Sequence, residues 1–98
     1  MEIKPEHKEY LESKKLTFEQ DCGLYSIWRY KDIKILCHKD SYSDGYLYRF
    51  KGSKYFLTLE GLFCYYVEKY SKEIKAREKA IENYKDFLQN FYEMAGSV

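Results

Sequence analysis

The chain has 98 residues, which is enough for one domain and too few for two separate hydrophobic cores. Its 17 lysines and arginines nearly balance its 16 aspartates and glutamates, and the net charge of +1 argues against an acidic tail or a uniformly polycationic coat for DNA. Hydrophobic residues make up 45% of the chain, too many for a disordered protein, yet no apolar run approaches the roughly 20 residues that span a bilayer, so we expect a cytoplasmic protein that does not enter the membrane.

The N-terminal segment, residues 1–16, is predicted to contain a short helix over residues 5–15. Pro5 suits the first turn of a helix, where its missing N–H would have no partner. Glu6 favours the positive end of the helix dipole, and Lys14 favours the negative end. The few apolar residues of this segment can dock on a larger body, but such a helix is not stable alone.

The middle segment, residues 17–58, shows the alternation of strands rather than the period of a helix. Lys31-Asp32 is placed as a two-residue hairpin turn, although it lacks the preferred glycine, and Asp44-Gly45 is a strong turn signal. The predicted strands are residues 24–30, 33–37, 46–50 and 55–58, with 17–21 as a candidate fifth strand. This order predicts an antiparallel meander, so the single domain of residues 1–98 belongs to the α+β class.

The C-terminal segment, residues 59–95, is predicted to be helical, with Thr58 as its N-cap. Apolar or long side chains recur from Phe63 at alternating steps of four and three, which is the spacing of a heptad seam. A straight helix of about 36 residues would extend roughly 54 Å and overhang a domain whose radius of gyration is near 13 Å. Either the helix breaks near Ser71 and folds back, or it stays straight and pairs with a partner; the unbroken spacing slightly favours the straight form.

A straight helix would offer its seam to a second copy of the chain. Arg77 interrupts the seam, and an antiparallel pair would allow an acidic residue, such as Glu73 or Glu78, to face it. We therefore expect a homodimer through the C-terminal helix. The predicted self-association residues are Tyr70, Ile74, Arg77, Ile81 and Tyr84.

The predicted sheet is both the basic and the aromatic part of the chain. Residues 23–58 carry seven basic residues against three acidic ones, and the whole chain contains 12 tyrosines. An open sheet face with tyrosine, arginine and lysine is a candidate recognition surface, unless the N-terminal helix covers it or codon bias alone explains the tyrosines. The predicted partner-binding residues are Trp28, Arg29, Tyr46, Tyr48, Arg49 and Lys51.

Motifs for catalysis or metal binding are absent from the sequence. Cys22, Cys37 and Cys64 have no close spacing, and with His38 they make only a weak zinc set, so we expect buried free thiols. No phosphate-binding loop or nucleophile motif occurs. We therefore expect no cofactor, no metal and no enzymatic activity.

These observations favour a small module that binds a protein. In size and composition the chain is similar to phage-encoded or mobile-element proteins that inhibit host machinery, including anti-defence inhibitors. The alternative is single-stranded nucleic-acid binding by the same sheet, because strands that enter a helix at Tyr55 to Leu62 resemble the ββββα units of single-strand binders. Salt separates the two hypotheses, since phosphate contacts weaken steeply as salt rises.

Overall fold

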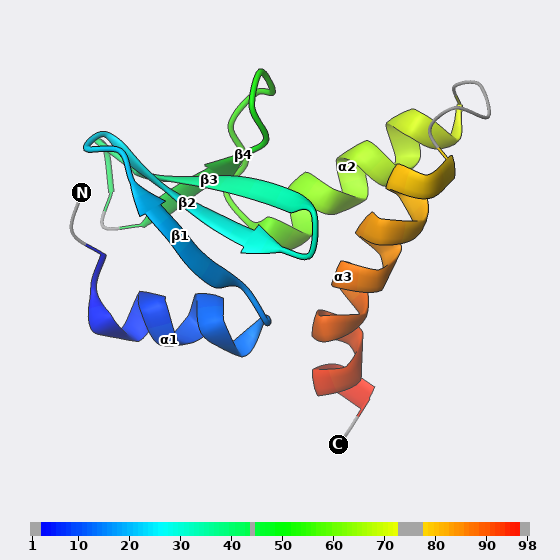
Figure 1. The fold of residues 1–98 in the computed structure, drawn as a ribbon, viewed down its shortest axis with the longest axis horizontal. Helices are drawn as coiled ribbons and strands as arrows, with labels where there is room; N and C mark the ends of the chain where they lie inside the picture. Colours follow the sequence, from blue (N-terminus) through cyan, green and yellow to red (C-terminus); the bar gives the residue numbers. More distant parts are fainter. Residues whose placement is uncertain (1–2, 44, 73–77, 97–98) are drawn as a thin grey trace.

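The structure is a computed structural model that describes residues 3–43, 45–72 and 78–96, with side chains of the last helix described as far as Phe91. In chain order the elements are α1 (Pro5–Ser13), β1 (Thr17–Asp21), β2 (Tyr25–Tyr30), β3 (Ile33–Lys39), β4 (Tyr46–Arg49), α2 (Leu59–Ser71) and α3 (Glu78–Gly96), arranged as in Figure 1. The N-terminal helix, the antiparallel sheet and the helical C-terminal part confirm the predicted α+β class.

The four strands form one antiparallel meander in the order β1-β2-β3-β4. Lys31 adopts a left-handed conformation (φ 53°) in the predicted turn between β2 and β3. The candidate fifth strand exists as β1, and it pairs with β2 through a register shift between Phe18 and Gln20.

The strand predicted over residues 55–58 is wrong. Only an isolated bridge forms there, in which Tyr48 and Phe56 exchange two backbone N–H···O bonds of 2.8 Å. The segment is too short to continue the ladder because Thr58 already caps α2, with its Oγ1 accepting from the N–H of Gly61 at 2.9 Å.

The two faces of the sheet differ in what they contact. One face, called the inner face, carries Ser26, Trp28, Tyr30, Ile33, Ile35, Cys37, Tyr46 and Tyr48, all buried. The seven apolar residues of this set join buried residues of α1, α2 and α3 in a single core. The opposite, outer face carries Tyr25, Ile27, Arg29, Lys34, Leu36, His38, Leu47 and Arg49, which are neighbours through the strand register. Ile33, Ile35 and Cys37 share the inner face of β3 as predicted, and exposed Lys34 lies on the other side, where Leu36 is nevertheless buried.

The straight C-terminal helix that we favoured is wrong, and the alternative break near Ser71 is correct. α2 ends at Ser71, and α3 returns to pack on α2, with the rings of Phe63 and Phe87 stacked 4.2 Å apart. Figure 1 shows α3 leading from the far end of α2 back toward the level of α1. Among the described seam residues, Phe63 and Leu88 are buried in the core, and Val67, Tyr70, Tyr84 and Phe91 pack against it half-buried. Among the described residues, no helix has both the length and the apolar character to cross a membrane.

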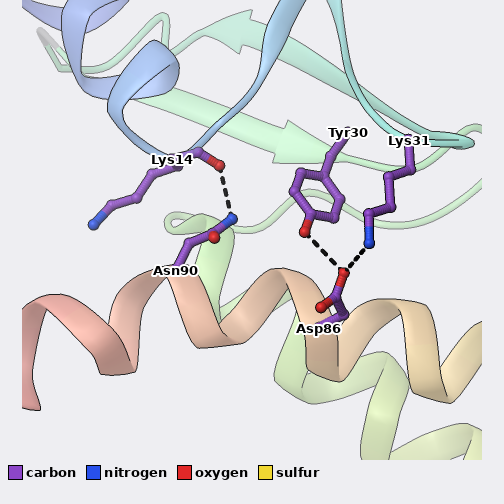
Figure 2. A network of polar contacts seen from close by, with 5 residues as sticks. All are labelled: Lys14, Tyr30, Lys31, Asp86 and Asn90. Carbon is purple, nitrogen blue, oxygen red and sulfur yellow. Dashed lines mark hydrogen bonds and ion pairs between the residues drawn. The ribbon is translucent and has the colours of Figure 1, made fainter.

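Polar contacts also fix α3 to the rest of the fold, as Figure 2 shows. The Asp86 Oδ2 accepts from the Tyr30 hydroxyl at 2.8 Å and from the Lys31 Nζ at 2.5 Å. One turn further along, the Asn90 Nδ2 donates to the Lys14 carbonyl oxygen at 2.9 Å. Asp86 and Asn90 lie four residues apart and so share one side of α3. These contacts reach the sheet through β2 and its turn, and they reach the end of α1.

Candidate functional site

Three of the predicted partner-binding residues lie in the core. Trp28, Tyr46 and Tyr48 are only 1%, 8% and 4% exposed on the inner face, so the expectation that they form an open aromatic surface is wrong. Their polar tips are satisfied inside the molecule. The Lys4 N–H donates to the Tyr46 hydroxyl at 3.0 Å, and the Tyr48 hydroxyl lies 2.7 Å from Nε2 of His7. Buried tyrosines with hydrogen-bonded hydroxyls have the same sequence pattern as exposed ones.

The other three predicted residues, all basic, lie outside the core. Arg29 is exposed on the outer face and forms an ion pair with Glu19, with 3.9 Å between Nη1 and Oε1. Lys34 reaches the other oxygen of the same carboxylate at 3.5 Å. Arg49 is half-buried on the outer face, and Lys51 is exposed in the turn after β4. The structure therefore brings Arg29 and Arg49 to the same face and separates them from the three predicted rings.

A different set of side chains forms the open apolar surface, which we call the outer patch. It borders an open hollow of about 660 Å³ between the ends of β3 and β4 and the neighbouring loops. Leu24 is 86% exposed, Tyr42 is 98% exposed and Tyr55 is 54% exposed. The outer patch consists of Leu24, Tyr25, His38, Tyr42, Leu47, Arg49 and Tyr55. Of these, only Arg49 was among the predicted partner-binding residues.

His38 is at the centre of the outer patch. Its ring centroid lies 5.1 Å from that of Tyr25 and 5.0 Å from that of Tyr55. The Arg49 Nε donates to its Nε2 at 3.0 Å, and the Arg49 guanidinium carbon lies 5.5 Å from the Tyr55 ring centroid. Burial, and then the positive charge of Arg49, hold the pKa of His38 below its usual 6.5. The ring is therefore neutral near pH 7 and can accept the hydrogen bond.

A second cluster, formed by His7, Tyr46, Tyr48 and Cys37, joins α1 to the inner face. The His7 ring stacks on Tyr46 with centroids 3.9 Å apart, and its Nε2 lies 4.0 Å from the Cys37 Sγ. Burial raises the pKa of Cys37 to about 12 and lowers the pKa of His7. A thiol with that pKa is not a nucleophile at neutral pH. The contacts of His7 with Tyr46 and Tyr48 hold α1 against the inner face.

The cysteines do not gather around a metal site. Cys22, Cys37 and Cys64 are all free thiols, with Cys37 buried and the other two half-buried. Among the residues that the structure describes, no three cysteine, histidine or acidic side chains come together in a way that could hold a metal ion. The weak zinc set of the sequence is thus dispersed.

The predicted self-association residues are partly used within the chain. Tyr70 on α2 and Tyr84 on α3 stack on one another, with ring centroids 6.0 Å apart. Ile81 is half-buried on α3. Ile74 and Arg77 lie outside the described residues. The homodimer stays a prediction, and the packing of α2 on α3 removes the straight seam on which it was based.

No protein-family model matches the chain, and no curated protein or solved structure matches it significantly. Because a fold by itself does not determine an activity, function is inferred here from the chemistry of the surface. On the described part of that surface, the outer patch brings together the highly exposed Leu24, Tyr42 and Tyr55 with the basic side chain of Arg49.

Proposed function

We propose that the protein is a small, non-enzymatic binding domain that takes a protein partner on the outer patch. The observation that carries this proposal is that the helices contact the inner face, while Leu24, Tyr42 and Tyr55, in loops beside the outer face, keep apolar and aromatic groups in solvent. None of these three residues belongs to the core; Tyr55 contacts His38 and Arg49 within the outer patch. Exposed apolar and aromatic groups gathered in one place, with arginine beside them, are typical of protein interfaces.

The charge distribution favours a protein over a nucleic acid. Arg29 and Lys34 share the Glu19 carboxylate, so two cations of the outer face are already neutralised in part. The outer patch also includes the aliphatic side chains Leu24 and Leu47, which cannot stack on bases as aromatic rings do. Single-stranded nucleic acid stays the second candidate, because Arg49 and Tyr55 together offer a cation beside an exposed ring.

Inhibition is the action that we propose for a domain of this kind, since it can block a partner by covering a surface. The expectation that the partner belongs to host machinery, and that the chain comes from a phage or mobile element, stays a prediction.

A matched pair of variants tests the proposed function. The wild-type chain, Leu24→Asp and Leu57→Asp are used as bait in a lysate of the cells that make the protein. Leu57 is 75% exposed, like Leu24, but it lines a separate hollow beside His7 and Tyr46. We expect wild type and Leu57→Asp to capture the same protein and Leu24→Asp to lose it. The amount captured should change little between low and high salt. Capture that survives Leu24→Asp, or that disappears with nuclease treatment, would contradict the proposal.

A further inference from the structure

We propose that Arg49 is the specificity-determining residue of the outer patch and that it binds a carboxylate side chain of the protein partner. This inference rests on the proposed function and adds the chemistry of the partner to it. The starting observation concerns charge. Among the described residues no carboxylate pairs with Arg49, although the residue is half-buried, whereas Arg29 and Lys34 on the same face both reach Glu19. A cation on a residue that is partly withdrawn from water is costly unless a partner neutralises it.

The hydrogen bond to His38 prepares Arg49 for such a partner. Its Nε is occupied by the 3.0 Å bond to the His38 Nε2, and the guanidinium lies beside the Tyr55 ring. Both contacts restrict the rotamers of a side chain that is otherwise flexible, so less entropy is lost on binding. Among the described residues, the N–H groups on the two terminal nitrogens make no hydrogen bond, and they match the two oxygens of a carboxylate. His38 acts here as a positioning residue.

The neighbours of Arg49 indicate what surrounds the carboxylate. In the strand register Arg49 pairs with Leu36, and the next pair on the same face is Leu47 with His38. Leu36 is buried although it does not belong to the core that the helices cover, so the outer face itself excludes water there. An acidic residue flanked by apolar residues would bury apolar area against Leu47 while it pairs with Arg49. We therefore expect the partner segment to carry an acidic residue with apolar residues directly beside it or one position away.

A phosphate is the weaker fit for the same guanidinium. Glu19 lies across the outer face, and Asp40 lines the hollow of the outer patch. A polyanion that runs over the face would meet both carboxylates, whereas a single aspartate or glutamate would not. We therefore commit to a protein carboxylate.

A random dodecapeptide library displayed on phage, panned on the full chain, tests this inference without knowledge of the natural partner. Enriched peptides are synthesised, and their affinities are measured by fluorescence polarisation for wild type, Arg49→Met, Arg49→Lys and Arg29→Met. Arg49→Met removes the charge and keeps most of the stem, while Arg29→Met is the matched control on the same face. We expect peptides with an aspartate or glutamate next to apolar residues. Arg49→Met should weaken them about tenfold or more, Arg49→Lys less, and Arg29→Met by less than about twofold.

The outcomes separate this inference from the proposed function. One outcome would overturn the role of Arg49 and leave the binding function in place. In that outcome the enriched peptides lack acidic residues, their affinity is lost with Leu24→Asp, and it is unchanged with Arg49→Met. Enriched peptides that no outer-patch variant affects, or a library that yields none, would overturn both. A fluorescent oligothymidine that binds wild type and is lost with Arg49→Met would also overturn both, in favour of nucleic acid. Circular dichroism of each variant tests whether the fold is retained. If Arg49→Met does not fold, the affinity of the peptides for Arg49→Lys, compared with wild type and Arg29→Met, tests the role of Arg49 instead.

Discussion

At the scale of single residues, several buried polar groups among the described residues are paired with partners in distant parts of the sequence. Among the described residues, no buried side-chain nitrogen or oxygen lacks a hydrogen-bond partner. Tyr30 reaches Asp86, Tyr48 reaches His7, and Asn90 reaches the backbone of Lys14. Buried polar groups of this kind contribute modestly when paired and cost more when a partner is removed.

Asn90 is the clearest case for a test at this scale. Its side chain is buried and donates to the Lys14 carbonyl, so Asn90→Ala would leave that carbonyl without this donor and open a small cavity. We expect the free energy of unfolding to fall by about 1–2 kcal/mol, measured by urea denaturation. The neighbouring Gln89 is exposed, and Gln89→Ala is expected to change stability by less than about 0.5 kcal/mol. Equal effects of the two variants would show that the Asn90 hydrogen bond is unimportant.

At the scale of elements, the sequence predicted helices and strands well where local signals were strong. The start of α2 follows from Thr58 as N-cap, and the turn at Lys31-Asp32 lies between two alternating runs. The break after Ser71 was harder to predict, because residues with a three-four spacing pack equally well against a second chain and against the same chain folded back. Only the tertiary contacts, such as that between Phe63 and Phe87, decide between these arrangements.

β1 shows how an edge strand can be kept from further pairing. All five of its residues are exposed, and it lies at the end of the sheet order. The register shift between Phe18 and Gln20 interrupts its ladder, and Glu19 places a charge at its centre. A bulge and charged side chains are common protections of exposed edges. For this reason the outer patch, rather than the β1 edge, is the better candidate for partner binding.

The end of α1 contains a local conflict between sequence and backbone. Lys15 follows the helix in a left-handed conformation (φ 67°), which side chains with a Cβ adopt at a cost and glycine adopts freely. We expect Lys15→Gly to raise the free energy of unfolding by about 1 kcal/mol in urea denaturation. The same substitution at exposed Lys8, inside α1, is expected to lower it by about 1 kcal/mol. A loss of stability in both variants would contradict the left-handed assignment of Lys15.

At the scale of the whole molecule, the sequence could not show which side of each strand meets the helices. Lys34 and His38 marked the solvent side of β3 correctly. In β2 and β4, however, both sides carry large or aromatic residues. The sequence therefore did not distinguish the buried side from the exposed side, and Trp28, Tyr46 and Tyr48 were wrongly predicted to be exposed. The pairing of the strands places the neighbouring residues Arg29, Leu47 and Arg49 on the same side as Lys34. This pairing joins residues that are distant in the sequence, so the local alternation of residues could not reveal it.

The whole fold is expected to lose stability as the pH falls below neutral. His7, stacked on Tyr46 beneath α1, and His38, between Tyr25 and Tyr55 beside Arg49, both have their pKa values lowered, chiefly by burial. A histidine with a lowered folded-state pKa binds its proton more tightly in the unfolded chain. Stability is therefore complete above the unfolded pKa of about 6.5 and is lost as pH falls toward the folded pKa.

Urea denaturation between pH 7.5 and 5 measures this loss. The wild-type unfolding free energy is expected to decline with falling pH, and a variant with His7→Gln and His38→Gln should decline less. A second decline belongs to lower pH, because the Tyr42 N–H lowers the pKa of Asp40 and the hydrogen bond from Lys31 lowers that of Asp86. Carboxylates with lowered pKa values stabilise the fold above their unfolded pKa of about 4 and lose that contribution as pH falls further. Constant or rising stability between pH 7.5 and 5 would show that neither imidazole is held neutral by the fold.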